Sequence, residues 1–266
     1  MTNIMVVAHT PWFSESDIKI STVDGKAVRV IDFLHRDDEA ILKLWAKHFR
    51  EHYVKDENID EACVPMGLSR SEYLQTIKFP SEPHIISGEF SEILVADYIE
   101  FILNYLVPRT RYNNKTNRNT SPHGVDVIAF KFIGEREDRN DELLTCEIKA
   151  TLVKKNKNKF QEAVNHSKKD YNVRLPEALN AMRQRLKELG NLDLVKTIER
   201  FQNRTSRPYK AITGAALVCS DRCWSEDCVS TTDSTHPNDN LYLFVIKGDS
   251  LMDLAKRLYE LAYVTA

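Results

Sequence analysis

The segment that decides the fold runs from residue 143 to 153 and reads LLTCEIKATLV. Successive side chains of a β-strand point to opposite faces of the sheet. One face of this segment is then entirely apolar and consists of Leu144, Cys146, Ile148, Ala150 and Leu152. The other face is polar and consists of Thr145, Glu147, Lys149 and Thr151. Glu147 and Lys149 therefore project side by side, about 6–7 Å apart along the strand.

A second strand is predicted at 125–133, which is apolar apart from two charged residues. A run of this kind is typical of a strand covered on both faces, so we expect it in the centre of the sheet. Asp126 lies at its start, where a charge is costly unless it is paired or binds a metal. Carboxylate oxygens are preferred ligands of Mg²⁺. Asp126, Glu147 and the main-chain carbonyl of Ile148 are therefore candidate metal ligands, and Lys149 can orient a metal-activated water.

Asp126 followed by Glu147, Ile148 and Lys149 resembles the P-D…(D/E)-x-K pattern of the restriction-endonuclease-like nucleases. The chain departs from that pattern at Val125, where these enzymes usually have proline. The resemblance implies a restriction-endonuclease-like core, in which helices flank a central mixed sheet. It also implies hydrolysis of DNA with Mg²⁺, or Mn²⁺, as cofactor.

These nucleases often have a G-x-x-x-E signature on a preceding helix, and residues 88–92 read GEFSE. Glu92 fits the signature as a helper carboxylate in catalysis, and Glu89 is a second candidate for the same role. Such nucleases also often have a helix after the second strand with a Gln, Lys or Glu that faces the site. Gln161 or Glu162 fits that place.

More narrowly, the chain is similar to the small nuclease subunit of the Hachiman anti-phage defence system. The shared features are its size, an N-terminal α+β extension, the helix start GEFSEIL at 88–94 and the strand CEIKA at 146–150. This resemblance implies a role in bacterial defence. It further implies a partner helicase that controls the nuclease.

The order of predicted elements indicates an α/β fold with an N-terminal α+β segment at 1–80. We expect the nuclease core at 81–266, with a helical insertion at about 160–203. Apolar periodicity predicts helices at 37–54 and 88–107. Further strands are predicted at 17–21, 27–33, 213–219 and 241–246, followed by a closing helix at 249–263.

The formal net charge is only −2, yet basic residues gather in two runs that flank the predicted site. Runs of this kind favour a polyanionic partner. We expect them to contact the DNA backbone through Arg109, Arg111, Lys115, Arg118, Lys154, Lys155 and Lys157.

The chain has only 8 glycines, and their spacing forms neither a phosphate-binding P-loop nor a G-x-G-x-x-G turn. An ATPase, a kinase or a dinucleotide-dependent enzyme is therefore excluded, and any ATP-driven work falls to a partner. No apolar run reaches the roughly 20 residues of a membrane span, and no signal peptide is recognised. The five cysteines are an odd number, which favours a reducing cytoplasm.

Three alternatives compete with this interpretation. His48, Glu51 and His52 form the H-x-x-E-H motif of zinc peptidases, with Glu51 as general base. A loose zinc clip is possible at Cys219, Cys223, Cys228 and His236. The chain can also be a catalytically silent DNA-binding subunit, although the presence of the Asp, Glu and Lys favours activity.

Overall fold

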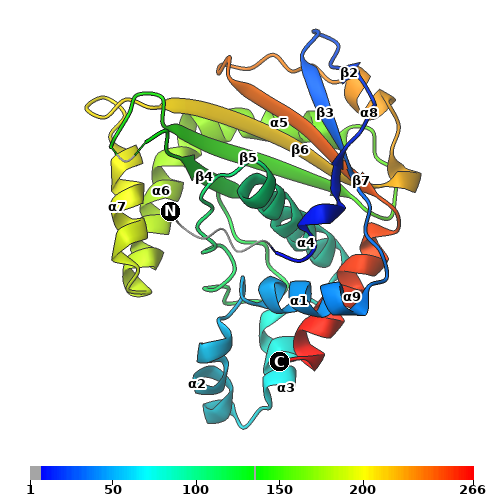
Figure 1. The fold of residues 1–266 in the computed structure, drawn as a ribbon, viewed down its shortest axis with the longest axis vertical. Coiled ribbons are helices and arrows are strands. Elements are labelled where there is room, and N and C mark those ends of the chain that lie inside the picture. Colours follow the sequence, from blue (N-terminus) through cyan, green and yellow to red (C-terminus); the bar gives the residue numbers. More distant parts are fainter. Residues whose placement is uncertain (1–6, 135) are drawn as a thin grey trace.

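A mixed β-sheet with helices on both faces forms the middle of the molecule (Figure 1). The structure is a computed structural model, and it describes residues 7–134 and 136–266. Its described strands are β1 (Phe13–Glu15), β2 (Ile20–Ser21), β3 (Ala27–Phe33), β4 (Val127–Lys131), β5 (Glu142–Thr151), β6 (Lys210–Ser220) and β7 (Leu241–Gly248). They follow the order β1-β3-β7-β6-β5-β4, and β2 pairs with β3 outside this row. The predicted α/β class, with a central mixed sheet flanked by helices, is confirmed.

The inner strands β3, β7, β6 and β5 run parallel, whereas β1 and β4 pair antiparallel at the two ends. Parallel neighbours need long crossover connections, which are usually helical. The described helices are α1 (Glu39–Arg50), α2 (Ile59–Cys63), α3 (Arg70–Tyr73), α4 (Pro83–Asp97), α5 (Lys159–Lys169), α6 (Leu175–Glu188), α7 (Leu192–Gln202), α8 (Asp227–Ser230) and α9 (Leu251–Val264). The crossover from β5 to β6 consists of α5, α6 and α7.

Strand β5 has the two faces that its sequence predicts, and a different helix covers each face of the sheet. Cys146 and Ile148 belong to the core between the sheet and α4. On the opposite face, Leu217 of β6 and Val245 of β7 share a core with Phe160 of α5. The polar side chains of β5 therefore lie on the α5 side of the sheet.

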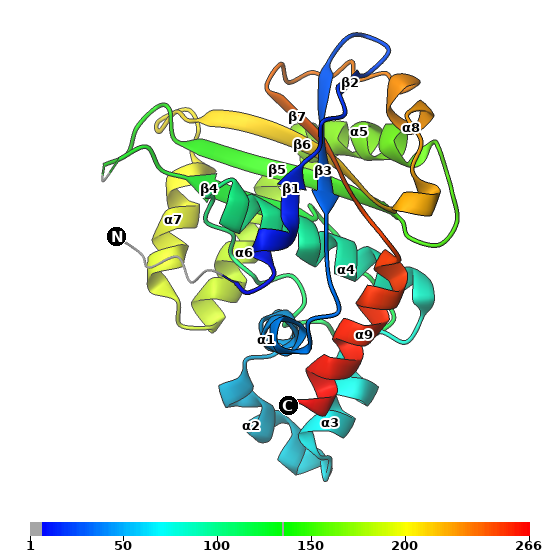
Figure 2. The ribbon, with the colours of Figure 1, turned by 45° about the vertical axis from the view of Figure 1, so that its right-hand side comes forward.

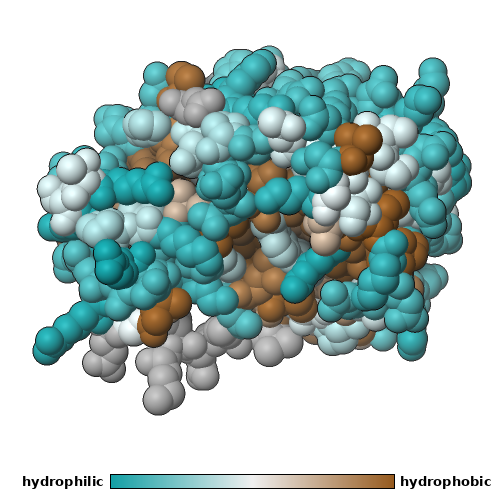
Figure 3. Space-filling view, turned by 90° about the horizontal axis from the view of Figure 1, so that it is seen from above, coloured by the Kyte–Doolittle hydropathy of each residue, from teal (hydrophilic) through white to brown (hydrophobic). Residues whose placement is uncertain are grey.

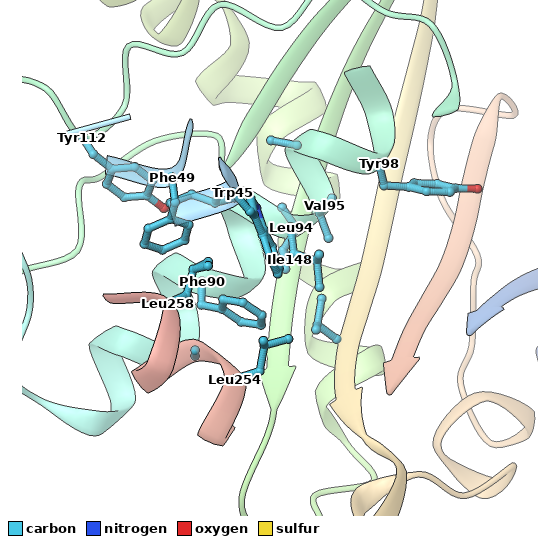
Figure 4. Close-up of a cluster of buried hydrophobic side chains, with 14 of the residues drawn as sticks. Trp45, Phe49, Phe90, Leu94, Val95, Tyr98, Tyr112, Ile148, Leu254 and Leu258 are labelled. Atoms are coloured by element: carbon cyan, nitrogen blue, oxygen red, sulfur yellow. The ribbon is translucent and has the colours of Figure 1, made fainter. Parts of the chain in front are cut away.

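Helix α4 lies between the sheet and the helix pair α1 and α9 (Figure 2). Trp45 and Phe49 of α1, Phe90 of α4, Leu258 of α9 and Ile148 of β5 gather in this core (Figure 4). A helix with apolar residues around most of its circumference is stable only when it is buried. The few carboxylates of α4 are therefore buried with it and need partners.

The expectation that the strand at 125–133 lies in the centre of the sheet is wrong, because β4 is the last strand of the row. Strand β4 is apolar because other parts of the chain pack against both of its faces. Val127 faces the core around α4, while the ring of Phe130 packs 4.9 Å from that of Phe201 on α7. Leu106 also exchanges two main-chain hydrogen bonds with Phe130, of 2.7 and 2.9 Å, and covers part of the open edge.

The helix predicted at 88–107 has different ends in the structure. It begins at Pro83, because proline is tolerated in the first turn of a helix. It continues as a π-helical turn to Ile102, and Asn104 then takes a left-handed conformation with φ of 59°. The chain therefore leaves the helix before residue 107, where the sequence predicted its end.

Residues 7–80 share the sheet and the core with the rest of the chain. Strand β3 pairs in parallel with β7, from Arg29 opposite Phe244 to Asp32 opposite Lys247. Helix α1 packs on α9. The division at residue 80 stays a prediction.

No helix in the described part of the chain has the length and apolar character needed to cross a membrane. The face seen from the top of Figure 1 is mainly hydrophilic, and hydrophobic residues show in patches near its centre (Figure 3).

Candidate active site

The candidate site lies where β4 begins and β5 extends past it. Val127, the first residue of β4, pairs with Cys146, so the following residues of β5 lie beyond the end of β4. Asp126 takes the place of the missing partner, and its Oδ2 accepts a hydrogen bond of 2.9 Å from the main-chain N–H of Ile148. This contact fixes the Asp126 carboxylate beside the polar face of β5.

The four residues predicted to act in catalysis line one open cleft of about 780 Å³. Glu92 reaches it from α4, Asp126 from the start of β4, and Glu147 and Lys149 from β5. The main chain of Ile148 also lines it. Residues up to 57 positions apart in the sequence therefore meet at one edge of the sheet.

Arg111 joins two of the carboxylates. Its guanidinium donates to Glu92 Oε2 at 2.6 Å and to Asp126 Oδ1 at 2.8 Å. The same group donates to the carbonyl oxygens of Val125 at 2.7 Å and Pro122 at 3.0 Å. A positive charge therefore lies between the two carboxylates in this structure.

Of the two helix carboxylates that the sequence left open, Glu92 is the one that lines the cleft. Glu89 is fully buried elsewhere, where it accepts a hydrogen bond of 2.6 Å from the hydroxyl of Tyr53. Its other oxygen pairs with the ammonium of Lys115. Glu89 therefore belongs to the packing between α4 and the loop at 103–126.

The helix after β5 brings residues to the site that sequence reasoning missed. Nδ1 of His166 lies 3.2 Å from Oε1 of Glu147, which also pairs with Lys149. Asp170, one helical turn further on, is buried and raises the pKa of Glu147. His166 and Asp170 are four residues apart, so the i, i+4 spacing on the helix after the E-x-K strand was the available signal.

The residues expected on that helix point elsewhere. The side chain of Gln161 bonds the main chain of Asp233, with hydrogen bonds of 2.8 and 3.1 Å. Glu162 pairs with Lys159 at 2.5 Å. Neither lines the cleft. The expectation that Gln161 or Glu162 faces the site is wrong, because their faces of α5 are turned away from β5.

Burial and mutual repulsion make the carboxylates of the cleft hard to ionise. Burial raises the pKa of Glu92 to about 7 and that of Asp126 to about 6, although Arg111 opposes both shifts. Burial, with the neighbouring carboxylates, also raises the pKa of Glu147 and of Asp170. Burial alone would lower the pKa of Lys149, but the Glu147 carboxylate outweighs it and the pKa is raised. A cation among these oxygens would favour their ionised forms.

The family of the chain follows from comparison with known proteins. The family model for HamA matches residues 8–262. The chain belongs to the HamA family. HamA is a subunit of the Hachiman anti-phage defence system, so the resemblance drawn from the sequence is confirmed at the level of the family. No curated protein matches the chain.

The first basic run of this HamA-family chain is turned inward. Arg109 pairs with Asp97 and Glu100, Arg111 with the site carboxylates, and Lys115, whose side chain is 2% exposed, with Glu89. Arg118 donates to the carbonyl of Gln75 at 2.6 Å. Contact of Arg109, Arg111 or Lys115 with DNA would require these ion pairs to break.

The second basic run is exposed. Lys154, Lys155 and Lys157 follow β5 and line a groove of about 420 Å³. This groove shares Ala150 and Lys159 with the cleft of the candidate active site. The two surfaces are therefore continuous.

The H-x-x-E-H motif does not form a peptidase site. Nε2 of His48 lies 3.4 Å from Nε2 of His52 and 3.0 Å from Oδ1 of Asp97. Glu51, which would be the general base, points instead toward Lys55, 3.9 Å away. His52 and Asp97 are buried, which leaves no access for a peptide.

The predicted zinc clip does not come together either. Cys219, Cys223 and Cys228 are buried free thiols. In the described residues, their sulfur atoms and a nitrogen of His236 do not approach one another closely enough for a metal. Nδ1 of His236 accepts the main-chain N–H of Asn238 at 2.9 Å instead.

Proposed function

We propose that this HamA-family chain is a Mg²⁺-dependent deoxyribonuclease with a restriction-endonuclease-like core. It acts in anti-phage defence under the control of a partner helicase. The observation that supports this most strongly is the meeting of Glu92, Asp126, Glu147 and Lys149 in one cleft. Their order along the chain and their places on helix and strands agree with the P-D…(D/E)-x-K pattern.

The residues of the cleft fit a hard divalent cation. The guanidinium of Arg111 lies between Glu92 and Asp126, which shows that this place favours positive charge. Asp126 and Glu147 would be the metal ligands, together with the carbonyl oxygen of Ile148. The N–H of Ile148 points to Asp126, and the N–H and C=O of a strand residue point to the same side. Oδ2 of Asp170 has no hydrogen-bond partner in the described residues and adds a further candidate oxygen.

Mn²⁺ would fit the same oxygen ligands. When bound, such a cation lowers the pKa of a water molecule and stabilises charge on a phosphate group.

The side chains of the protein supply the rest of the chemistry. Lys149 holds its charge because Glu147 pairs with it, and it would orient the attacking water and neutralise charge on the phosphate. Glu92 would act as a helper that accepts a proton, for which its pKa of about 7 is suited. The reaction would be a direct attack of water on the phosphodiester bond.

The exposed lysines after β5 give the DNA backbone a path to the cleft. Lys154, Lys155 and Lys157 would contact phosphates along the groove that continues into the site. Contacts of this kind release counterions, so binding would weaken steeply as the salt concentration rises.

The experiment that tests the function uses plasmid and linear DNA with Mg²⁺ or EDTA, with and without the proposed partner helicase. We expect cleavage that needs Mg²⁺ and falls at least about 100-fold in Glu147→Gln and in Lys149→Met. Glu260→Gln is the matched control, since Glu260 is exposed on α9 and pairs with Arg257. Cleavage by Glu147→Gln at the parent rate would show that the site assignment is wrong.

A silent DNA-binding subunit would give a different result. Such a subunit would bind DNA but would not cleave it in Mg²⁺, either alone or with the helicase. That outcome would contradict the proposed nuclease.

A further inference from the structure

A second polar cluster lies between the segment before β1, α1 and α4. It consists of His9, His48, His52 and Asp97. Three of them, His48, His52 and Asp97, offer ligand atoms that all lie within 4.8 Å of one another. Nε2 of His9 lies 3.1 Å from Oδ2 of Asp97, and both of these side chains are fully buried. The cluster therefore joins three segments that are distant in the sequence.

Hydrogen bonds leave part of this cluster without partners. Neither ring nitrogen of His9 has a hydrogen-bond partner in the described residues, and neither has Oδ2 of Asp97. The two atoms that lie 3.1 Å apart are thus close without being aligned as donor and acceptor. Nε2 of His48 and Nε2 of His52 also face each other, 3.4 Å apart. Buried polar atoms without partners are costly, unless a further group binds them.

The ligand atoms of His48, His52 and Asp97 lie as close together as the ligands of one zinc ion. Zinc binds histidine nitrogen at about 2.0–2.1 Å, so neighbouring ligand atoms of a tetrahedron lie about 3.3 Å apart. The contacts of 3.4 Å between His48 and His52 and of 3.0 Å between His48 and Oδ1 of Asp97 match this edge. His9 contacts the other carboxylate oxygen, Oδ2, at 3.1 Å. We propose that His48, His52 and Asp97 bind a structural Zn²⁺ ion, and that His9, which is buried beside Asp97 with both ring nitrogens unpartnered in the described residues, is the fourth ligand.

The surroundings hold the ligands in place. The ring of His9 stacks on Trp45, with ring centres 4.0 Å apart. Arg109 donates to Oδ1 of Asp97 at 2.8 Å and also pairs with Glu100. Partners of this kind orient metal ligands and tune their basicity. Glu100 also neutralises the guanidinium, which otherwise would repel a nearby cation.

Three histidines and one aspartate favour zinc over Mg²⁺, which prefers oxygen ligands. Four protein ligands complete a tetrahedron and leave no open position for a substrate. The ion therefore acts in stability, not in peptide hydrolysis. It ties the start of the chain and α1 to α4, and Glu92 lies on α4 only five residues before Asp97.

The test is the metal content of the full chain, expressed without a metal-binding tag and measured by plasma mass spectrometry. We expect about one zinc per chain, and less than about a tenth of that in the double variant His48→Ala/His52→Ala. Two controls should keep the zinc. Glu51→Gln removes the peptidase base, and Asp126→Asn removes a ligand of the proposed Mg²⁺ site.

A second measurement covers the case in which the double variant does not fold. The parent chain, freed of metal by a chelator, is titrated with Co²⁺. We expect the visible absorption bands of tetrahedral Co²⁺ and a rise in Tm as the ion binds. A parent chain without zinc that shows neither bands nor a Tm shift would overturn the site. Zinc that stays in a folded His48→Ala/His52→Ala variant would overturn it as well.

Discussion

Arg111 is the residue whose position in the structure matters most for the proposed site. Its guanidinium lies between Glu92 and Asp126, where a metal ion would also be attracted. At the proposed metal site the two positive charges would compete for the same oxygens, so Arg111 would lower the affinity of the cleft for the metal. Release of Arg111 on contact with DNA or a partner would raise that affinity.

This competition predicts the effect of Arg111→Met. We expect Mn²⁺ to bind at least about tenfold more tightly, because one partly buried charge interaction of about 1.4 kcal/mol is removed. Calorimetric titration with Mn²⁺ measures the change. Arg118→Met serves as the control, since Arg118 bonds a main-chain carbonyl away from the carboxylates. Weaker Mn²⁺ binding by a folded Arg111→Met variant would contradict the competition.

The raised pKa of Asp126 gives a prediction about pH. Its pKa is 3.8 in the unfolded reference and about 6 in the folded protein. The folded state therefore binds more protons than the unfolded state between these values, and stability falls as the pH rises through them. In EDTA, the parent chain should lose on the order of 1–3 kcal/mol relative to Asp126→Asn between pH 4 and pH 7. Urea unfolding at several pH values measures the difference. A difference that does not depend on pH would show that the carboxylate ionises normally.

At the scale of the elements, the end of β7 approaches the end of β3 closely. A Cβ atom at Gly248 would lie 2.7 Å from the carbonyl oxygen of Phe33 and 3.0 Å from Cδ2 of Leu251. The first of these atoms belongs to the main chain of a paired strand and has little freedom to move. Glycine at this position therefore lets β3, β7 and α9 meet.

Gly248→Ala should therefore destabilise the fold, by about 1–3 kcal/mol. Gly88→Ala is the matched control, and we expect it to stabilise the fold instead. A Cβ at Gly88 meets nothing within 4 Å, and alanine in a helix gains up to about 1 kcal/mol over glycine. Thermal or urea unfolding of both variants measures the effects. Equal stability of the two variants would show that the contact at Gly248 is relaxed in solution.

The elements also show which local signals in the sequence were reliable. Ser69 and Glu72 form a capping box at the start of α3, which the Ser-x-x-Glu spacing signals. Cys146 and Ile148 of β5 face the core around α4, as the alternation in the sequence indicates. The ends of α4 were predicted less well. The helix starts at a proline and ends in a π-helical turn, and both ends depend on packing against the rest of the core.

At the scale of the whole molecule, the first 80 residues complete both the sheet and the core. Strand β3 covers the edge of β7, and Trp45 and Phe49 of α1 are fully buried against α4 and α9. Without them, β7 would present an open edge and a large apolar surface to water.

A fragment of residues 81–266 should therefore fail to fold alone, although the sequence suggests it as a separate nuclease core. We expect it to aggregate or to lack cooperative thermal unfolding, whereas the full chain unfolds cooperatively. Circular dichroism and size-exclusion chromatography measure this. A monomeric fragment with cooperative unfolding would show instead that the two parts are independent domains.

Patterns in the amino-acid sequence were enough to predict the α/β class, the family, and the four residues that line the cleft. These depend on local patterns, because side-chain alternation in a strand and motif spacing are set by near neighbours in the chain. The position of β4 at the edge of the sheet became known only from the packed fold. That position opens the place beside β5 where the cleft lies. The packed fold also showed that Arg111 joins Glu92 to Asp126, and that His9 meets the cluster around Asp97. These contacts join segments that are distant along the chain, so they depend on how whole elements pack, which no local pattern specifies.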